Sequence, residues 1–317
     1  MFQARLLAVA AASALLAACG TSASQVIPAQ SGDTQASSHE LTTLSTFTAR
    51  DNTTGALVRI LPPRDVFTSI RDNGRVAMAG TPLLYHNGSI QTAPKIYVVF
   101  WGSSWNTSTG DPNGVAAKLK GFLGVIGGSR WLNSVTQYTQ SGGAHVGNAA
   151  GSFVGSYVDT TSSPPNAPTQ TQLAAEAKKA AAVYGNYTAS ASYIVALPHG
   201  IKPSGFGSQY CAWHSSTSAT GGTIAYTNLP YMPDAGASCG AGSVNSPGTL
   251  DGVTIVGGHE QGETETDPYP NSGWLDSSGA ENGDKCAWVS LINNPNAGGY
   301  PTQPLWSNAT SSCVQSY

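Results

Sequence analysis

The sequence predicts one mixed α/β or α+β domain over residues 56–317, with a mixed sheet, one long helix and a loop-rich C-terminal part tied by disulfides. Apolar, β-branched runs alternate with segments of helical periodicity in the first half of this range, a pattern typical of strands alternating with helices. A longer helical segment then follows a short strand, and four cysteines lie beyond residue 210. The chain of 317 residues is long enough for one large domain of this kind.

The first 18 residues have the pattern of a bacterial export signal. One positive charge, Arg5, precedes an apolar run over 6–18, which is too short to span a bilayer as a helix and is typical of a secretory signal peptide. The run ends in Leu-Ala-Ala-Cys, which resembles the lipobox of bacterial lipoproteins and makes Cys19 the expected lipid-anchored residue. The alternative is an ordinary signal peptide cut near Cys19. Because Gly20 is not Asp, we expect a lipoprotein of the bacterial cell envelope, in the outer membrane, or else a secreted protein.

Residues 19–55 are rich in Ser, Thr, Gln and Ala and poor in large apolar side chains, so we expect a flexible tether. Only 10% of the chain is charged and its net charge is −3, which provides no basic surface for nucleic acid. No segment after the signal peptide is apolar enough in sequence to cross a membrane. The lipid on Cys19 is therefore the only membrane contact that the sequence predicts.

Local patterns predict the elements of the domain in order. A continuous β-branched and aromatic run, 95–101, is typical of a buried strand, and apolar residues at helical spacing follow Asp111-Pro112. Shorter runs of the same two kinds complete the series. The expected strands are 56–61, 95–101, 152–157, 192–197 and 222–228, and the expected helices are 113–126, 169–184 and 250–266.

The helix 250–266 has recognisable start and stop signals. Thr249 or Asp251 can cap its N-terminus. Pro268 disfavours helical geometry in the residue before it, so we expect the helix to end near Thr266.

Four cysteines remain when Cys19 is set aside, and an even number in an exported chain indicates disulfides. Three pairings are possible, and we favour the two that are local in sequence. A zinc site made of all four cysteines is the alternative, which the absence of any Cys-x-x-Cys pair disfavours. The expected disulfides are Cys211–Cys239 and Cys286–Cys313.

Negative charge is concentrated in and after the helix 250–266. Eight of the 17 acidic residues fall between Asp251 and Asp284, and no Lys or Arg lies among them; Lys285 is the first. Unpaired negative charge beside apolar helix turns is costly unless something neutralises it. A divalent cation is the simplest neutraliser.

The centre of this region is Gly257-Gly-His259-Glu260-Gln-Gly-Glu263. His259 and Glu263 are four residues apart, share one face of the helix and can bind one zinc ion together. Glu260 holds the position that HExxH peptidases give to the general base, which takes a proton from the attacking water. Glu263 stands in place of the second histidine. Gly257 and Gly258 should let other backbone approach the helix closely.

A third metal ligand must come from another segment. Asp284 and Glu281 are nearly equal candidates, because they lie on an acidic turn beside one of the expected disulfides. Asp267 lies eight residues past His259, at the end of the helix. His199 and His214 come from the preceding loops, and either could also stabilise a developing oxyanion.

The layout from the strand 95–101 to the helix 250–266 resembles that of the zincin metallopeptidases, with HExxE in place of HExxH. The downstream third-ligand motif of that family is missing. This resemblance implies a zincin-like domain and a peptide or protein substrate.

A second resemblance covers residues 95–290 and is to the phosphate-induced, exordium-like secreted proteins and their bacterial relatives. Plant members of that family lack the His-Glu pair at 259–260, are extracellular and have no established enzymatic reaction. The resemblance implies an exported fold with metal-site and metal-free versions. The matching pieces are Tyr97-Val-Val-Phe-Trp-Gly102, Arg130-Trp131 to Tyr138, Pro198-His199-Gly200, Cys211-Ala-Trp-His214, Pro233-Asp-Ala-Gly236 with Cys239, Leu250-Asp-Gly-Val253, Thr266-Asp-Pro268, Gly273-Trp274 and Glu281 to Cys286.

The sequence as a whole predicts a zinc-dependent hydrolase of the endopeptidase type. His259, Glu263 and either Asp284 or Glu281 would bind zinc, and Glu260 would act as the base. The strand 222–228 could offer an open edge on which a peptide substrate adds as a further strand. A serine hydrolase is disfavoured because the chain has no GxSxG motif.

Three alternatives do not require catalysis. His259 could be a buried structural histidine paired with Glu281. The acidic residues could bind calcium, which prefers six to eight oxygen ligands. The domain could also be a binding module for carbohydrate or a partner protein. Its contact residues, if exposed, would then be Trp213, Tyr226, Tyr231 and Trp274.

Overall fold

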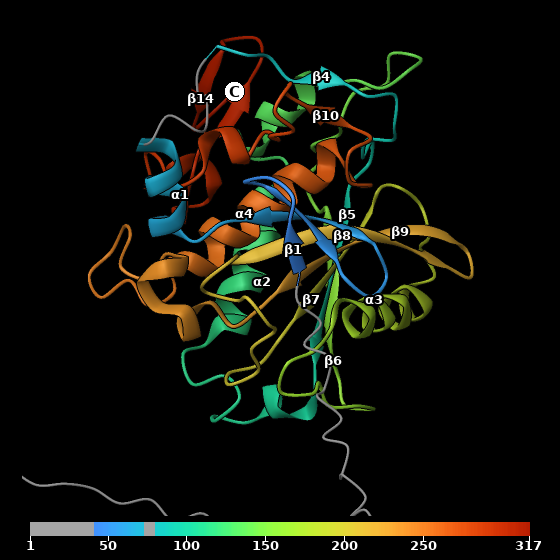
Figure 1. Cartoon of the computed structure of the whole chain (residues 1–317), viewed down its shortest axis with the longest axis vertical. Helices are drawn as coiled ribbons and strands as arrows, with labels where there is room; N and C mark the ends of the chain where they lie inside the picture. The colour runs from blue at the N-terminus through green and yellow to red at the C-terminus, as the bar shows by residue number, and fades with distance from the viewer. Residues whose placement is uncertain (1–40, 73–79) are drawn as a thin grey trace, which may run out of the picture. The chain divides into compact units, whose positions relative to one another are not determined.

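An eight-stranded mixed sheet organises residues 41–72 and 80–317, the part of the chain that the computed structural model describes (Figure 1). The expected signal peptide, Cys19 and the first part of the expected tether lie outside these residues. Among the described residues, no helix is both long enough and apolar enough to cross a membrane.

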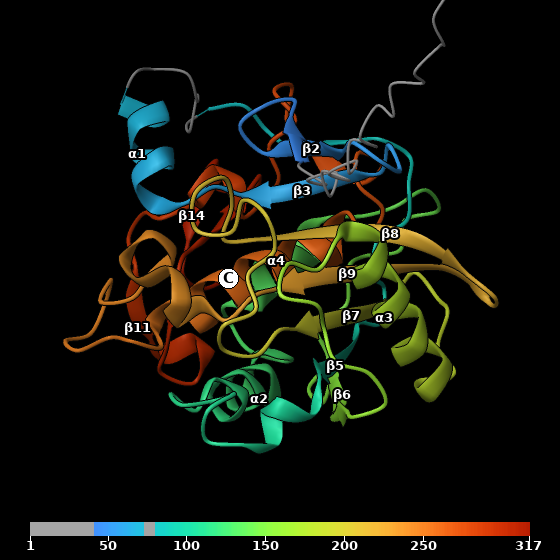
Figure 2. The same cartoon turned by 60° about the horizontal axis from the view of Figure 1, so that its bottom comes forward.

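Half of the sheet is antiparallel and half is parallel. The antiparallel half runs in the order β1 (Leu41–Thr43), β2 (Thr48–Asp51), β3 (Leu57–Leu61), β8 (Ala212–Ala219) and β9 (Gly222–Leu229). The parallel half continues from β9 to β7 (Ala191–Ala196), β5 (Lys95–Trp101) and β6 (Phe153–Asp159). Figure 2 shows this order from β2 at the top to β6 at the bottom.

Helices cover both faces of the sheet, and β5 shows why. Its Ile96, Val98 and Phe100 belong to the core that includes α2 (Val115–Ile126) and α4 (Asp251–Thr266). The alternate residues Tyr97, Val99 and Trp101 belong to a second core, with α3 (Gln170–Tyr184). Because successive side chains of a strand point to opposite faces, a strand covered on both sides must be apolar throughout.

The helix α4 is buried along its whole length, from Asp251 to Thr266. On one side it contacts the strands β3, β8 and β9, and on another the helix α2 and the strand β12 (Tyr300–Thr302). A polar helix in such a place must find partners for its side chains within the protein.

The other elements of the fold are short. The remaining helix is α1 (Arg64–Asp72), and the remaining strands are β4 (Leu84–Tyr85), β10 (Trp274–Leu275), β11 (Ile292–Asn294), β13 (Leu305–Ser307) and β14 (Ser312–Val314). The 3₁₀ helices are η1 (Ser103–Asn106), η2 (Leu132–Gln137), η3 (Met232–Cys239), η4 (Asp284–Cys286) and η5 (Pro295–Ala297).

The expected mixed α/β fold with a mixed sheet is confirmed, and so are both expected disulfides, Cys211–Cys239 and Cys286–Cys313. All eight expected strands and helices are present with small shifts at their ends. The helix α4 ends at Thr266, as the proline signal predicts.

Several expectations about these elements are wrong. The expected tether over 19–55 extends too far, because β1 and β2 lie within it and pair with the sheet. The strand β9 is central, between β8 and β7, so it has no open edge for a peptide. Neither Thr249 nor Asp251 caps α4; the Asp251 carboxylate instead accepts hydrogen bonds from the backbone of Val244 and Asn245.

The helix glycines also act differently from the expectation. At Gly258 an added Cβ would lie 2.9 Å from the Trp131 ring, so this glycine admits aromatic side chains. Backbone approaches α4 closely at Gly252, where an added Cβ would collide with the Cys239 carbonyl oxygen.

The two disulfides offer a matched test of how the fold is tied together. They close loops of nearly equal length, with separations of 28 and 27 residues. Loop-closure entropy therefore predicts a similar loss of about 3.5 kcal/mol when either pair is replaced by alanine. Urea unfolding of the two double variants measures this loss in the free energy of unfolding. We expect only the Cys286→Ala/Cys313→Ala variant to weaken zinc binding, because Cys286 belongs to η4. Equal zinc affinity in both variants would show that η4 needs no covalent support.

Candidate metal centre

Six ionisable side chains meet inside the protein, and we call them the buried cluster: His214, His259, Glu260, Glu263, Glu281 and Asp284. Three come from α4, two from the turn at η4, and His214 comes from β8. Each residue is at most 1% exposed. The sheet, the central helix and the disulfide-tied turn therefore build the cluster together.

The expected helix pair forms one group with the turn. His259 Nε2 lies 3.0 Å from Glu263 Oε1 and 3.7 Å from Asp284 Oδ1. Ligand atoms around a tetrahedral zinc ion lie about 3.4 Å apart, since each is 2.0–2.2 Å from the metal. The two distances from His259 Nε2 are close to this value, so the group could hold a metal ion, and its third side chain is Asp284 and not Glu281.

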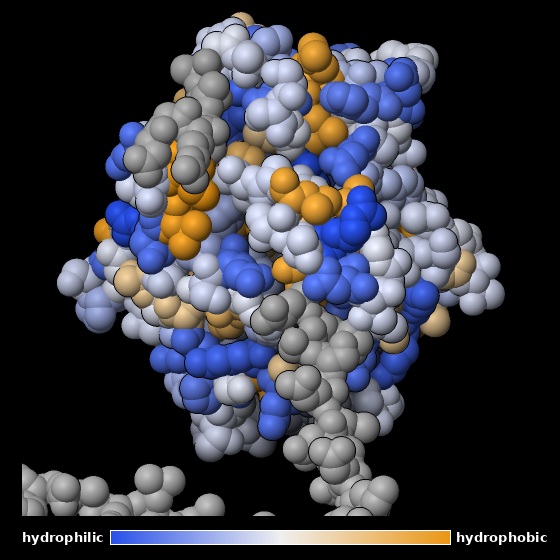
Figure 3. Space-filling view, in the orientation of Figure 1, coloured by the Kyte–Doolittle hydropathy of each residue, from blue (hydrophilic) through white to orange (hydrophobic). Residues whose placement is uncertain are grey.

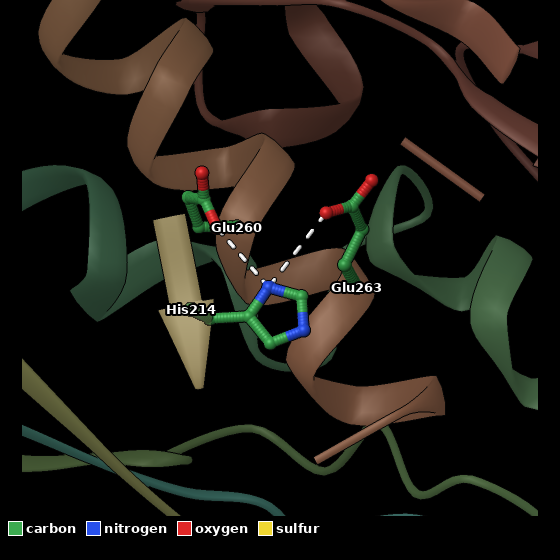
Figure 4. Close-up of side chains that lie close together, drawn as sticks. All are labelled: His214, Glu260 and Glu263. Carbon is green, nitrogen blue, oxygen red and sulfur yellow. Dashed lines mark hydrogen bonds and ion pairs between the residues drawn. The ribbon is translucent and has the colours of Figure 1, made fainter. Parts of the chain in front are cut away.

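A second group forms around His214, as Figure 4 shows. Its Nδ1 lies 3.2 Å from Glu260 Oε2 and 3.8 Å from Glu263 Oε2. On the other side of the ring, His214 Nε2 lies 3.7 Å from Glu281 Oε1. Glu263 thus takes part in both groups, with one carboxylate oxygen in each.

Arg59 of β3 supplies the positive charge that the acidic segment lacks. Its Nε lies 2.8 Å from Glu281 Oε2 and its Nη2 lies 3.8 Å from Asp284 Oδ2. The guanidinium also donates to Thr48 Oγ1, Asn271 Oδ1 and the Gly279 carbonyl. Burial opposes its charge, yet the neighbouring carboxylates raise the pKa of Arg59 above the ordinary value.

Sequence reasoning missed Arg59 completely. It lies 222 residues before Glu281, in a strand whose pattern predicts only that it belongs to the sheet. The one available signal was an arginine inside an otherwise apolar strand, because a buried charge requires a buried partner.

The environment disfavours charge on the cluster when no cation is bound. Burial and mutual repulsion raise the pKa of Glu260, Glu263 and Asp284 well above the ordinary range. Burial lowers the pKa of His214 to about 3 and lowers the pKa of His259. Protons on the carboxyl groups and a cation are therefore alternative ways to neutralise the cluster.

Several buried atoms of the cluster have no hydrogen-bond partner within the described ranges 41–72 and 80–317. They are His214 Nε2, His259 Nε2, Glu260 Oε1, Glu281 Oε1 and Asp284 Oδ1. An unsatisfied buried polar atom costs about 1–3 kcal/mol, and native proteins contain few of them. Their convergence on one place fits a bound cation.

Gln303 contacts the His259 ring at its Nδ1 atom. Its amide nitrogen donates to the Gly283 carbonyl at 2.8 Å and lies 3.1 Å from His259 Nδ1. In this arrangement Nδ1 accepts, so the proton is on Nε2. For Nε2 to bind a metal, the amide must turn and present its unpartnered Oε1 to an Nδ1–H group.

Gly283 lets the turn lie directly on the helix. An added Cβ would be 2.8 Å from His259 Nδ1 and 2.9 Å from Glu263 Oε1. The Asp284 backbone N–H, next in the chain, donates to Glu263 Oε1 at 2.9 Å. The turn thus closes one side of the cluster.

Other candidate residues lie outside the cluster. His199 is half-exposed and its Nδ1 contacts Asp234 Oδ1 at 2.5 Å, so the structure does not bring it into the cluster. The Asp267 carboxylate accepts backbone N–H groups of Asn271, Ser272 and Gly273, which places it in a loop cap and not in the metal group.

The structure also places the residues of two non-catalytic alternatives. Glu281 forms its close pair with Arg59 and not with His259. The side chains of Trp213, Tyr226 and Tyr231 are buried. Trp274 is only partly buried, and its ring N–H donates to the Thr139 carbonyl. On the face that Figure 3 shows, hydrophobic areas are small and separated by polar ones.

Comparison with protein-family models, with curated proteins and with solved structures finds no match for this chain.

Stability should fall with rising pH when metal is removed. Burial raises the pKa of Glu265 to about 8 and raises the pKa values of the cluster carboxyl groups. Their contribution to the free energy of unfolding is complete below about pH 4.3, the ordinary pKa of a glutamate. This contribution is lost as the pH rises through the raised pKa values of the folded state. The histidine contributions are constant above their ordinary pKa of about 6.5.

Thermal unfolding in EDTA should therefore show a lower midpoint at about pH 8.5 than at about pH 7, and zinc should remove this difference. Glu265→Gln should reduce the pH slope without changing zinc binding. A midpoint in EDTA that is independent of pH would contradict the raised pKa values.

Gln303 should matter for metal affinity although it is not a ligand. Replacing it with leucine removes the acceptor for Nδ1–H, so zinc affinity should drop about 10- to 100-fold. Competition with a fluorescent chelator measures this. Gln315→Leu is the control, because that amide donates to the Ser290 carbonyl away from the cluster. Unchanged affinity in Gln303→Leu would mean that His259 does not bind zinc through Nε2.

Proposed function

We propose that the protein is an exported, zinc-dependent hydrolase of the endopeptidase type, with zinc held by His259, Glu263 and Asp284. One observation carries the proposal. Three potential ligand atoms, His259 Nε2, Glu263 Oε1 and Asp284 Oδ1, converge in a buried place, and two of them lack hydrogen-bond partners within the described residues. The HExxE spacing and its likeness to the zincins support the same conclusion.

Zinc supports hydrolysis by polarising a substrate carbonyl and making water more acidic. The residues around it have suitable roles. Glu260 follows His259 in α4, and the raised pKa of its carboxyl group, caused first by burial, suits a group that accepts and returns a proton. His214 lies 3.2 Å from Glu260 Oε2 and would orient that carboxylate.

The ligand types favour zinc over calcium. Two imidazoles, from His214 and His259, face the carboxylates of the cluster. Neutral imidazole is a common zinc ligand, whereas calcium binds oxygen almost exclusively and takes more ligands than either group provides.

Export belongs to the same proposal. The two disulfides are of the kind that forms in oxidising compartments. Together with the signal pattern over 1–18, the disulfides support a lipoprotein of the cell envelope anchored through Cys19. The exordium-like resemblance agrees with an extracytoplasmic location.

A second candidate function follows from the burial itself. Every residue of the cluster is at most 1% exposed, and structural zinc sites are closed whereas catalytic sites keep an open position. A cation here could stabilise a non-catalytic module. Catalysis instead requires an open coordination position that substrate and water can reach.

The test combines metal content with activity. The full chain, purified without chelators, should contain zinc and cleave casein. Glu260→Gln should retain zinc but lose casein cleavage by about 100-fold or more, since a general base contributes 10²–10⁴. Glu265→Gln is the matched control, because it removes another buried carboxyl of α4 outside the cluster. Zinc without casein cleavage in any form of the protein would favour the structural role, and undiminished cleavage by Glu260→Gln would exclude Glu260 as the base.

A further inference from the structure

One divalent cation leaves the cluster with negative charge. In the metal-bound state, four carboxylates from Glu260, Glu263, Glu281 and Asp284 face one guanidinium from Arg59. A cation at His259 offsets two of the three excess negative charges. Uncompensated charge in a buried place is costly, so a further positive group, either a proton or a second cation, is favoured.

Glu263 is placed between the two histidines. Its Oε1 lies 3.0 Å from His259 Nε2, and its Oε2 lies 3.8 Å from His214 Nδ1. Glu260 Oε2 completes the second group at 3.2 Å from His214 Nδ1 (Figure 4). A carboxylate with each oxygen in a different ligand group has the arrangement of a bridging ligand in a two-metal site.

His214 already has the surroundings of a metal ligand. Metal-binding histidines almost always donate their second ring N–H to a carboxylate, a carbonyl or water. His214 Nε2 lies 3.7 Å from Glu281 Oε1, which is longer than a hydrogen bond, and both atoms are buried without a hydrogen-bond partner in the described residues. Arg59 holds the other Glu281 oxygen at 2.8 Å. The His214–Glu260 contact alone leaves Nε2, Glu281 Oε1 and Glu260 Oε1 without hydrogen-bond partners among the described residues.

We propose that His214, Glu260 and Glu263 form a second cation site, which shares Glu263 with the site at His259. The inference rests on the proposed function for the first ion and adds regulation to it. A cation in the second site takes the Glu260 carboxylate as a ligand and removes it from proton transfer. Excess zinc therefore inhibits the enzyme that the first zinc ion activates.

The experiment is a zinc titration of the chelator-stripped full chain, followed by calorimetry and by elemental analysis after gel filtration. The wild type should bind about two zinc ions per chain, and His214→Ala and His259→Ala about one each, given tetrahedral sites with three protein ligands. His145→Ala is the control and should bind as the wild type does, because His145 is exposed and its ring contacts the Thr136 carbonyl, outside the cluster.

Glu260→Gln gives a second way to remove the new site if His214→Ala does not fold, which circular dichroism will show. It should also bind about one zinc ion, because a carboxamide is a poor zinc ligand. Casein cleavage by the wild type should rise up to the first equivalent of zinc and fall about 100-fold as the second binds.

The outcomes separate this inference from the proposed function. One zinc per wild-type chain, lost in His259→Ala and kept in His214→Ala, overturns the second site and leaves the first intact. Two zinc ions without any casein cleavage support the second site and overturn the hydrolase. Cleavage that stays constant beyond the first equivalent, with two ions bound, overturns the inhibitory role.

Discussion

The ion pair between Arg59 and Glu281 is the interaction on which the rest of the centre depends. Its atoms are 2.8 Å apart and both side chains are almost completely buried. The pair joins β3, in the antiparallel half of the sheet, to the turn that places Asp284 beside α4. Losing one partner of such a pair costs about 3–5 kcal/mol, because the other charge stays buried. The guanidinium also contacts Thr48 and the Gly279 carbonyl, so it determines where the turn lies relative to the sheet.

Much of the fold could be predicted because its signals are local. The run 95–101 is apolar on both faces and lies between two helical layers, as a doubly covered strand requires. Pro268 correctly marks the end of α4, and both disulfides join cysteines that are near in sequence. The likeness of His259 and Glu263 to a metal-binding pair was also local, since four residues make one helical step.

The remaining features depend on contacts between distant segments. Nothing in β9 reveals that β8 and β7 occupy its two sides, so its edge position was wrongly expected. The short strands β1 and β2 have too few apolar residues to be distinguished from a tether, and they persist because they pair with β3. The sequence predicts only that His214 lies in a loop. Its position beside Glu260 follows from the register of β8 in the sheet.

The long sequence separation between the parts of the centre has a consequence for how the molecule forms. Arg59 and Glu281 are 222 residues apart, and β3 pairs with β8 across about half of the chain. Contacts of such high contact order are slow to form, because the entropy of closing a long loop is lost before the contact contributes. The parallel strands and α3 can assemble from nearer partners. We therefore expect the centre to be completed late in folding, and a cation captured earlier by the carboxylates of α4 alone would meet an incomplete set of ligands.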